Sequence, residues 1–262
     1  MDPAAAFQAL ALQLAWGADE ALQDAPVDRL QPTPARPAPS QALHPAAAAP
    51  ANAGYSRTGM AAKAALLAEQ AESLEALRHA LEQLDLGLRD TAMHTVFAEG
   101  APSGIAVLTD APGVEDDSTG RPLSGPEGTY FDRMLASIGL ERSVLFVLPF
   151  VFWRPPGGRP PTAAEIEACL PFVRRALAFA RPRALLAFAG PPAAALLGRA
   201  AGRVASSSRA LALPGLQDPI PTLIMPSPGS CRADSRRRKE AWTALRGLAR
   251  IALSELSRRQ TS

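Results

Sequence analysis

The chain has 262 residues, more than the roughly 100–200 of a typical domain, and 47% of them are hydrophobic, so it can bury one core with residues to spare. Its 27 Lys and Arg against 25 Asp and Glu give a formal net charge of +2, which by itself indicates no anionic partner. Two cysteines without paired spacing exclude a locally encoded disulfide framework or closed metal site.

Two further features concern the location of the protein. The longest apolar run, residues 144–153, is far too short for a membrane-spanning helix of roughly 20 residues. The N-terminus has no basic region before its apolar stretch, so we expect no secretory signal. Together these features predict a cytoplasmic protein without a membrane partner.

The N-terminal part divides into a helix and a linker. Apolar residues three or four positions apart over residues 7–22 predict a short amphipathic helix within segment 1–23. Residues 24–59 consist largely of Ala, Pro, Gln and Ser, which cannot bury enough apolar surface to offset the entropy of ordering, so we predict a disordered linker. The helix either docks on its own domain or recognises a repair-protein partner, and both interpretations stay open.

Residues 60–95 are predicted to form a helical lead-in, with one helix over residues 61–84 that has no internal Pro or Gly. Residues 96–257 then alternate between apolar runs and helical segments. The runs are residues 105–108, 144–152, 184–189 and 222–225; the helical segments are residues 128–138, 163–180, 193–197 and 236–256.

Unbroken apolar runs are typical of strands that are buried on both faces, and strand–helix alternation favours right-handed parallel crossovers. We therefore predict an α/β domain, a three-layer α/β/α sandwich with a central four-stranded parallel sheet. Ligands of such sheets bind beyond the carboxyl ends of the strands, which here are the loops after Leu108, Phe152, Ala189 and Met225.

These loops carry motifs in a characteristic order. They read T-D-A-P-G from Thr109, G-R-P-L-S-G-P-E-G from Gly120, R-P-P-G-G-R-P-P from Arg154, E-I-E-A-C-L-P-F from Glu165 and P-S at Pro226. This order resembles the iron-sulfur (family-four) uracil-DNA glycosylases, whose motifs are G-E-A-P-G, G-x-P-F-x-G-x-x-G, N-x-x-x-x-R-P-P-G-N-R-x-P, E-x-x-x-C-x-P-F-L and H-P-S. The resemblance covers roughly residues 91–249 and implies the uracil-DNA glycosylase-like fold.

The resemblance implies a pocket for a base flipped out of DNA. In the family the acid positions water, the Phe stacks on the base, the Asn reads its edge and the His stabilises the leaving oxygen. The corresponding pocket residues here are Asp110, Ala111, Pro112, Gly113, Leu123, Pro149 and Met225.

Three of these positions have lost the family's chemistry. Leu123, in place of the Phe, has no aromatic face, which is worth roughly 1–3 kcal/mol per stacked base. Pro149 replaces the Asn without any donor, and Met225 replaces the His without a proton to give. Because losing one oxyanion donor costs about 10²–10³ in rate, we expect lost or strongly reduced uracil excision.

The metal ligands of the family are also incomplete. An iron-sulfur cluster needs four thiolates, and only Cys169 matches a ligand position, while Trp153 stands at another. We therefore expect no cofactor. Glu115, Asp116 and Asp117 either bind a metal or brace their loop, as the family counterparts do, and we favour bracing.

Several side chains are expected along the rim where the family meets DNA, since arginine suits contacts with phosphate. They are Arg121, Arg154, Arg159, Ser227, Arg232, Arg236, Arg237 and Arg238. The alternative is that these arginines only solubilise an Ala-rich protein.

The leading hypothesis is a divergent superfamily member that binds DNA or a repair-protein partner with little or no uracil excision. The alternative is an active DNA glycosylase with altered base specificity, in which Asp110 positions water.

Overall fold

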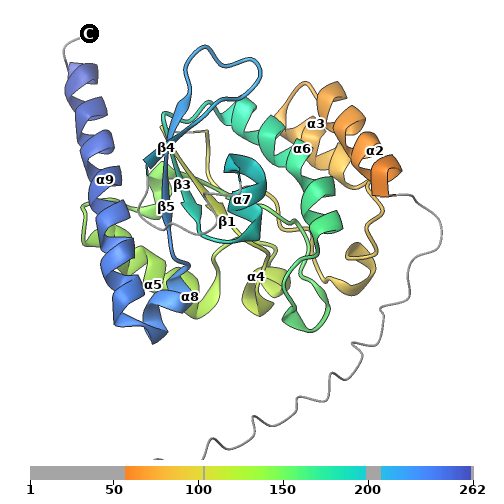
Figure 1. Cartoon of the computed structure of the whole chain (residues 1–262), viewed down its shortest axis with the longest axis horizontal. Coiled ribbons are helices and arrows are strands. Elements are labelled where there is room, and N and C mark those ends of the chain that lie inside the picture. Colours follow the sequence, from red (N-terminus) through yellow and green to blue (C-terminus); the bar gives the residue numbers. More distant parts are fainter. Residues whose placement is uncertain (1–56, 103, 199–207, 261–262) are drawn as a thin grey trace, which may run out of the picture. The chain divides into compact units, whose positions relative to one another are not determined.

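A computed structural model describes residues 57–102, 104–198 and 208–260 (Figure 1). These residues fall in the second of two units into which the chain divides, residues 52–262. The predicted helix at residues 7–22 and the linker up to residue 56 lie outside the described residues.

A five-stranded sheet forms the middle layer, in the order β2-β1-β3-β5-β4. Four parallel strands confirm the predicted sheet: β1 (Ile105–Thr109), β2 (Leu145–Pro149), β3 (Ala184–Phe188) and β5 (Ile220–Met225). The prediction omitted β4 (Ser208–Leu211), which pairs antiparallel with β5 at the edge. This strand has only four residues, two of them polar, so it carries no apolar run of the kind that marks the others.

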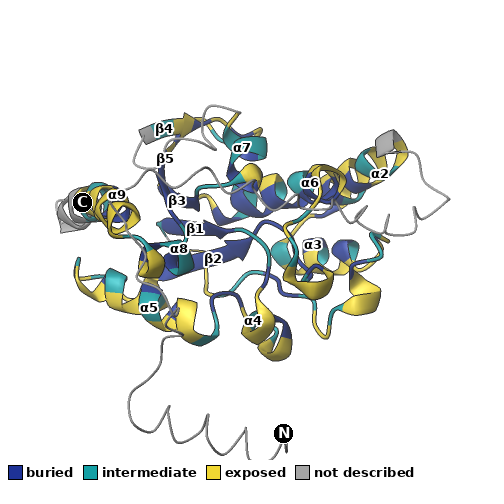
Figure 2. Cartoon of the chain, turned by 60° about the horizontal axis from the view of Figure 1, so that its bottom comes forward, coloured by how far each residue is buried: buried dark blue, intermediate teal, exposed yellow. Residues whose placement is uncertain are grey.

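Helices cover both faces of the sheet, which confirms the three-layer sandwich (Figure 2). One face packs against α2 (Arg57–Gln70), α3 (Leu74–Leu81), α6 (Ala163–Ala180) and α7 (Pro191–Leu197). The other face packs against α5 (Gly125–Ala136) and α9 (Ser235–Gln260), with α8 (Pro228–Ala233) beside them. Alternate residues of β1 divide between the two cores, Ala106 and Leu108 facing α6, Ile105 and Val107 facing α5 and α9.

The helical lead-in contains a break that the sequence analysis did not predict. Residues 61–84 were predicted as one helix, but α2 ends at Gln70 and α3 starts at Leu74. Ser73 has an extended backbone, and its hydroxyl accepts a hydrogen bond from Ala76 N at 3.0 Å. A serine that caps a new helix satisfies backbone donors that would otherwise have no partner, so it favours a start at this point. Both helices pack on α6.

Shorter elements connect these layers. They are α4 (Val114–Thr119) and the 3₁₀ turns η1 (Arg89–Thr91), η2 (Arg142–Val144) and η3 (Pro156–Gly158). Figure 1 shows α4 and α8 at the same end of the sheet, where β1 and β5 end. None of the helices in the described part of the chain is both long and apolar enough to cross a membrane.

Candidate functional site

A cavity of about 480 Å³ opens at the carboxyl end of the parallel strands, where ligands of such sheets bind. Four connections supply its walls: the β1–α4 loop, the segment before α5, the loop after β2 and the turn after β3. Ser227, after β5, completes it. Of the predicted base-pocket residues, Asp110, Ala111, Pro112, Gly113 and Leu123 line this cavity.

Asp110 follows β1 and is fixed by its backbone. Its carbonyl oxygen accepts hydrogen bonds from Phe150 N at 2.9 Å and Val151 N at 3.2 Å, which tie the β1 loop to the turn after β2. Its carboxylate lies against Gly190, where a Cβ atom would stand 3.3 Å from Oδ1. Burial, and secondly the charge of Glu127, raises the pKa of Asp110 to about 7. A carboxyl group with such a pKa can hold or accept a proton near neutral pH.

Asp116 and Asp117 hold the loop that follows. Asp116 accepts a hydrogen bond from Gly113 N through Oδ2 at 3.1 Å and from Ser124 N through Oδ1 at 2.6 Å. Asp117 Oδ1 accepts from Met93 N at 2.8 Å and from His94 N at 3.2 Å. These contacts give both carboxylates the bracing role that we favoured. No cluster of metal-ligand side chains occurs within residues 57–102, 104–198 and 208–260.

An aromatic residue that the sequence analysis missed also lines the cavity. Phe188, the last residue of β3, is 3% exposed and packs edge-on against Phe131 of α5, with ring centroids 5.7 Å apart. Leu123 lines the same cavity in a left-handed backbone conformation, with φ of 53°. The only sequence signal for Phe188 is its place at the end of an apolar run.

The two positions that correspond to the family's Asn and His lie elsewhere. Pro149 ends β2, where it pairs with Thr109, and it is buried. Met225 ends β5, is fully buried and packs in the core beneath α5 and α9. Neither lines the cavity. These positions therefore contribute packing to the core and no polar contact to the site.

The predicted DNA-contacting arginines fall into two groups. Arg159 donates two hydrogen bonds to Glu165, at 2.9 and 2.6 Å, and Arg121 pairs with Glu99. Arg238 donates to two backbone carbonyls at the end of α8, and Arg237 lies 3.9 Å from Asp234. These four side chains already have partners, and Ser227 caps α8 by accepting from Ser230 N at 3.3 Å.

The arginines of the second group are placed where they can contact a ligand. Arg154 lines the cavity, and Arg232 and Arg236 are exposed on α8 and α9. Further along α9, Lys239, Arg246 and Arg250 are exposed on the same side as Arg236, given their spacing on a helix. Glu240 is the one acidic residue between residues 235 and 252. The outer face of α9, defined by these four cations, is strongly basic and also carries Trp242, which is 44% exposed.

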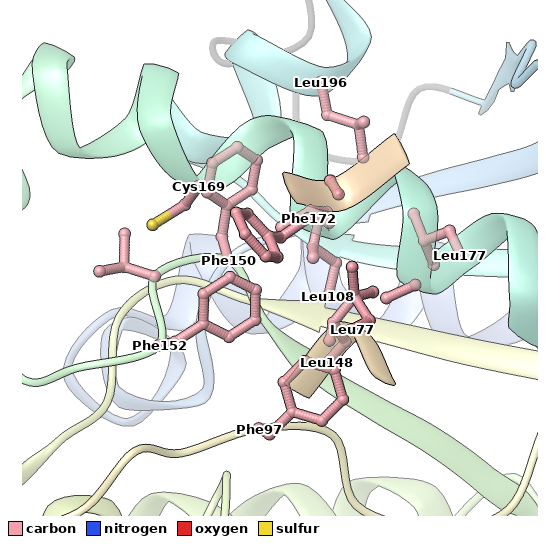
Figure 3. Packing of buried hydrophobic residues seen from close by; sticks show 14 of the residues in the cluster. Leu77, Phe97, Leu108, Leu148, Phe150, Phe152, Cys169, Phe172, Leu177 and Leu196 are labelled. Carbon is pink, nitrogen blue, oxygen red and sulfur yellow. The ribbon is translucent and has the colours of Figure 1, made fainter. Parts of the chain in front are cut away.

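The position of Cys169 tests whether an iron-sulfur cluster fits. The thiol is fully buried among Phe150, Phe152 and Phe172 (Figure 3), and burial raises its pKa to about 12. Cys231, the other cysteine of the chain, is buried in the opposite core, under α9.

Trp153, at another ligand position of the family, is 1% exposed and donates from Nε1 to Thr95 Oγ1 at 3.0 Å. A cluster needs four thiolates within reach of one another, whereas this chain holds a single thiol and a packed indole there. The residues present do not fit a cluster.

Comparison with known proteins agrees with this architecture, an α/β/α sandwich with a cavity beyond its parallel strands. Residues 97–246, more than half of the chain, match the family model of the uracil DNA glycosylase superfamily. The chain therefore belongs to that superfamily, as its motifs predicted.

The relatives that it resembles are type-4 uracil-DNA glycosylases. That of Pyrobaculum aerophilum is 34% identical over 94 residues, 36% of this chain and 48% of the relative. Those of Archaeoglobus fulgidus and Sulfurisphaera tokodaii are 37% identical over 82 residues and 36% over 95; the alignments cover 31% and 36% of this chain and 41% and 43% of the relatives. The alignments thus span less than half of each of these relatives.

Proposed function

We propose that this chain binds DNA and admits a base to its cavity, with lost or strongly reduced excision of uracil. One observation carries the proposal: the cavity keeps a carboxyl group at Asp110, while Pro149 and Met225 are buried outside it. A retained cavity supports ligand binding. The missing donors argue against uracil as the leaving group.

The chemistry of uracil release gives this argument its weight. Uracil leaves as an anion, so its departure needs donors or positive charge near the leaving oxygen. The cavity wall carries the carboxylates of Asp110 and Glu127. Of its two arginines, Arg154 and Arg159, the second is paired with Glu165. With no donor at Pro149 or Met225, we expect at least a 10³-fold slower excision than in an enzyme that has both.

The DNA half of the proposal rests on basic side chains that pair with no carboxylate among the described side chains. Arg154 stands at the cavity, and the outer face of α9 adds four exposed cations beyond α8. Each cation that reaches a phosphate releases counterions, so binding should weaken steeply with salt.

Four earlier expectations complete the proposal. Residues 96–257 act as the functional domain behind the helical lead-in, without an iron-sulfur cluster, in the cytoplasm. The segment at residues 7–22 either docks on its own domain or recruits a repair-protein partner.

A binding and excision experiment tests both halves. Fluorescence anisotropy with single-stranded and duplex DNA across salt concentrations should show binding that weakens as salt rises. The double variant R246Q/R250Q should lower the salt slope by about 1–2 relative to the wild type. R78Q/R174Q, which removes two exposed arginines from α3 and α6, serves as the matched control and should leave the slope unchanged.

Two outcomes contradict the proposal. No binding at low salt would reject the DNA half. Single-turnover uracil release within tenfold of a type-4 relative measured in parallel would reject the loss of excision.

A second function is favoured by the pKa of Asp110, about 7, in a cavity that a base can enter. The chain would then be an active glycosylase with altered base specificity, in which Asp110 orients water. Strand nicking by alkali after incubation with uracil, hypoxanthine, xanthine and alkylated-base duplexes decides this, with D110N as the inactive comparison. Absence of nicking on every duplex excludes it.

A further inference from the structure

Glu127 is a cavity residue to which the family motif assigns no role. It lies in the first turn of α5 and lines the cavity together with Asp110. The Glu127 carboxylate lies against the backbone of Gly229 at the start of α8, whose N–H favours the charged form of the carboxyl group. A Cβ atom at Gly229 would stand 2.0 Å from Oε1, so only glycine permits this approach. Glu127 therefore packs directly against the start of α8.

The charges around Glu127 come from every element packed on the cavity. Asp110 follows β1, Glu115 and Asp116 belong to α4, Arg154 follows β2, and Arg232 belongs to α8. Partial burial and the charge of Asp116 raise the pKa of Glu127, and Arg232 opposes them. Arg159 also lines the cavity, but Glu165 neutralises it. The cavity wall thus carries more negative than positive charge.

We propose that Glu127 is a specificity-determining residue and that, with Asp110, it makes this cavity select a base that carries positive charge, such as an N-alkylated purine. The inference rests on the proposed function, in that the cavity must admit a base. Two fixed carboxylates attract a cationic ring and repel an anionic one at short range.

A cationic base also needs no hydrogen-bond donor for its departure, and the cavity lacks the donors of the family. When the bond between C1′ and the base nitrogen breaks, its electron pair enters the ring and cancels the positive charge, so the base leaves neutral. Water forms the new bond to C1′ and gives its proton to the Asp110 carboxylate. This sequence uses no donor to the leaving group, which agrees with the burial of Pro149 and Met225 outside the cavity.

A pair of DNA duplexes separates charge from shape. One contains 2′-fluoro-7-methyldeoxyguanosine, whose base is cationic and whose fluorine prevents cleavage, and the other contains 2′-fluorodeoxyguanosine in the same sequence. The wild type should bind the cationic duplex about tenfold more tightly at low salt. E127Q should reduce this preference to about twofold, because the amide keeps the shape of the carboxylate beside Gly229 while the charge is gone. D110N provides a second variant with the same expected direction, and E167Q, on the exposed side of α6, should keep the full preference.

The outcomes discriminate between the claims. Equal affinity of the wild type for both duplexes overturns this inference and leaves DNA binding intact. E127Q that weakens both duplexes equally also overturns it, since Glu127 would then only position α8. Absence of binding to either duplex overturns the proposed function and this inference with it.

Discussion

The carboxyl ends of the parallel strands carry two different kinds of residue. On the β1 side, Asp110 faces the cavity and Asp116 and Asp117 hold the loop through backbone hydrogen bonds. The equivalent ends of β2 and β5, between which β1 and β3 lie in the sheet, carry Pro149 and Met225, both buried outside the cavity.

This contrast shows that some motif residues stabilise the fold, whereas others in the family contact the base. Asp116 and Asp117 satisfy backbone donors of this chain, so their removal would harm the fold whether or not a ligand binds. The Asn and His of the family serve the base, and a chain that does not excise uracil can place apolar side chains there. Trp153 and Cys169, at two cluster-ligand positions of the family, likewise belong to the hydrophobic core.

The largest expected effect on stability comes from replacing Trp153, which is buried in the apolar core. W153A should lower the free energy of unfolding by about 3–5 kcal/mol, because it removes a buried indole and leaves a cavity. Urea denaturation measures this loss. W242A, at an exposed tryptophan of α9, is the matched control and should change stability by less than about 1 kcal/mol. A loss below about 1 kcal/mol in W153A would show that this region is loosely packed.

Asp110 should have the next largest effect, with a magnitude that depends on pH. Its pKa rises from 3.8 to about 7 on folding, so between these values the folded state binds more protons than the unfolded state. Stability from this group therefore falls as pH rises from about 4 to about 7. D110N should stabilise the protein by about 2–4 kcal/mol at pH 8 and by nearly nothing at pH 3.5.

Chemical denaturation at the two pH values measures this difference. D90N, at an exposed aspartate of η1, is the control and should shift stability by less than about 0.5 kcal/mol at both. A stability gain in D110N that is the same at both pH values would contradict the raised pKa.

The fold was predictable from the sequence wherever a segment is uniformly apolar. Four unbroken apolar runs gave the parallel strands in the right order of occurrence. The edge strand β4 was missed because Ser208 and Arg209 interrupt its apolar character, and an edge strand needs no buried second face. The break between α2 and α3 depends on a single hydrogen bond of Ser73, which composition does not reveal.

The site was predictable only in part, for a related reason. The β1 loop follows from its motif, since its residues are neighbours in sequence. Glu127 of α5 and Gly229 of α8 meet from elements far apart in the sequence, and no local pattern signals that contact. In the same way, no local pattern signals the pairing of Arg121 with Glu99, so the sequence alone predicts that Arg121 contacts DNA.

The smallest expected effect concerns the loop after β1, where the neighbouring carboxylates of Asp116 and Asp117 can be compared. Asp117 uses one oxygen for both of its backbone donors, so D117N keeps an acceptor there and loses only the charge. Asp116 uses both oxygens, and in D116N an amide NH₂ would face a backbone N–H of Gly113 or Ser124. We expect a loss of about 2 kcal/mol in D116N and about 1 kcal/mol in D117N by urea denaturation, because an unpaired donor costs more than a weakened bond. A larger loss in D117N than in D116N would mean that charge, rather than the number of acceptor oxygens, holds the loop.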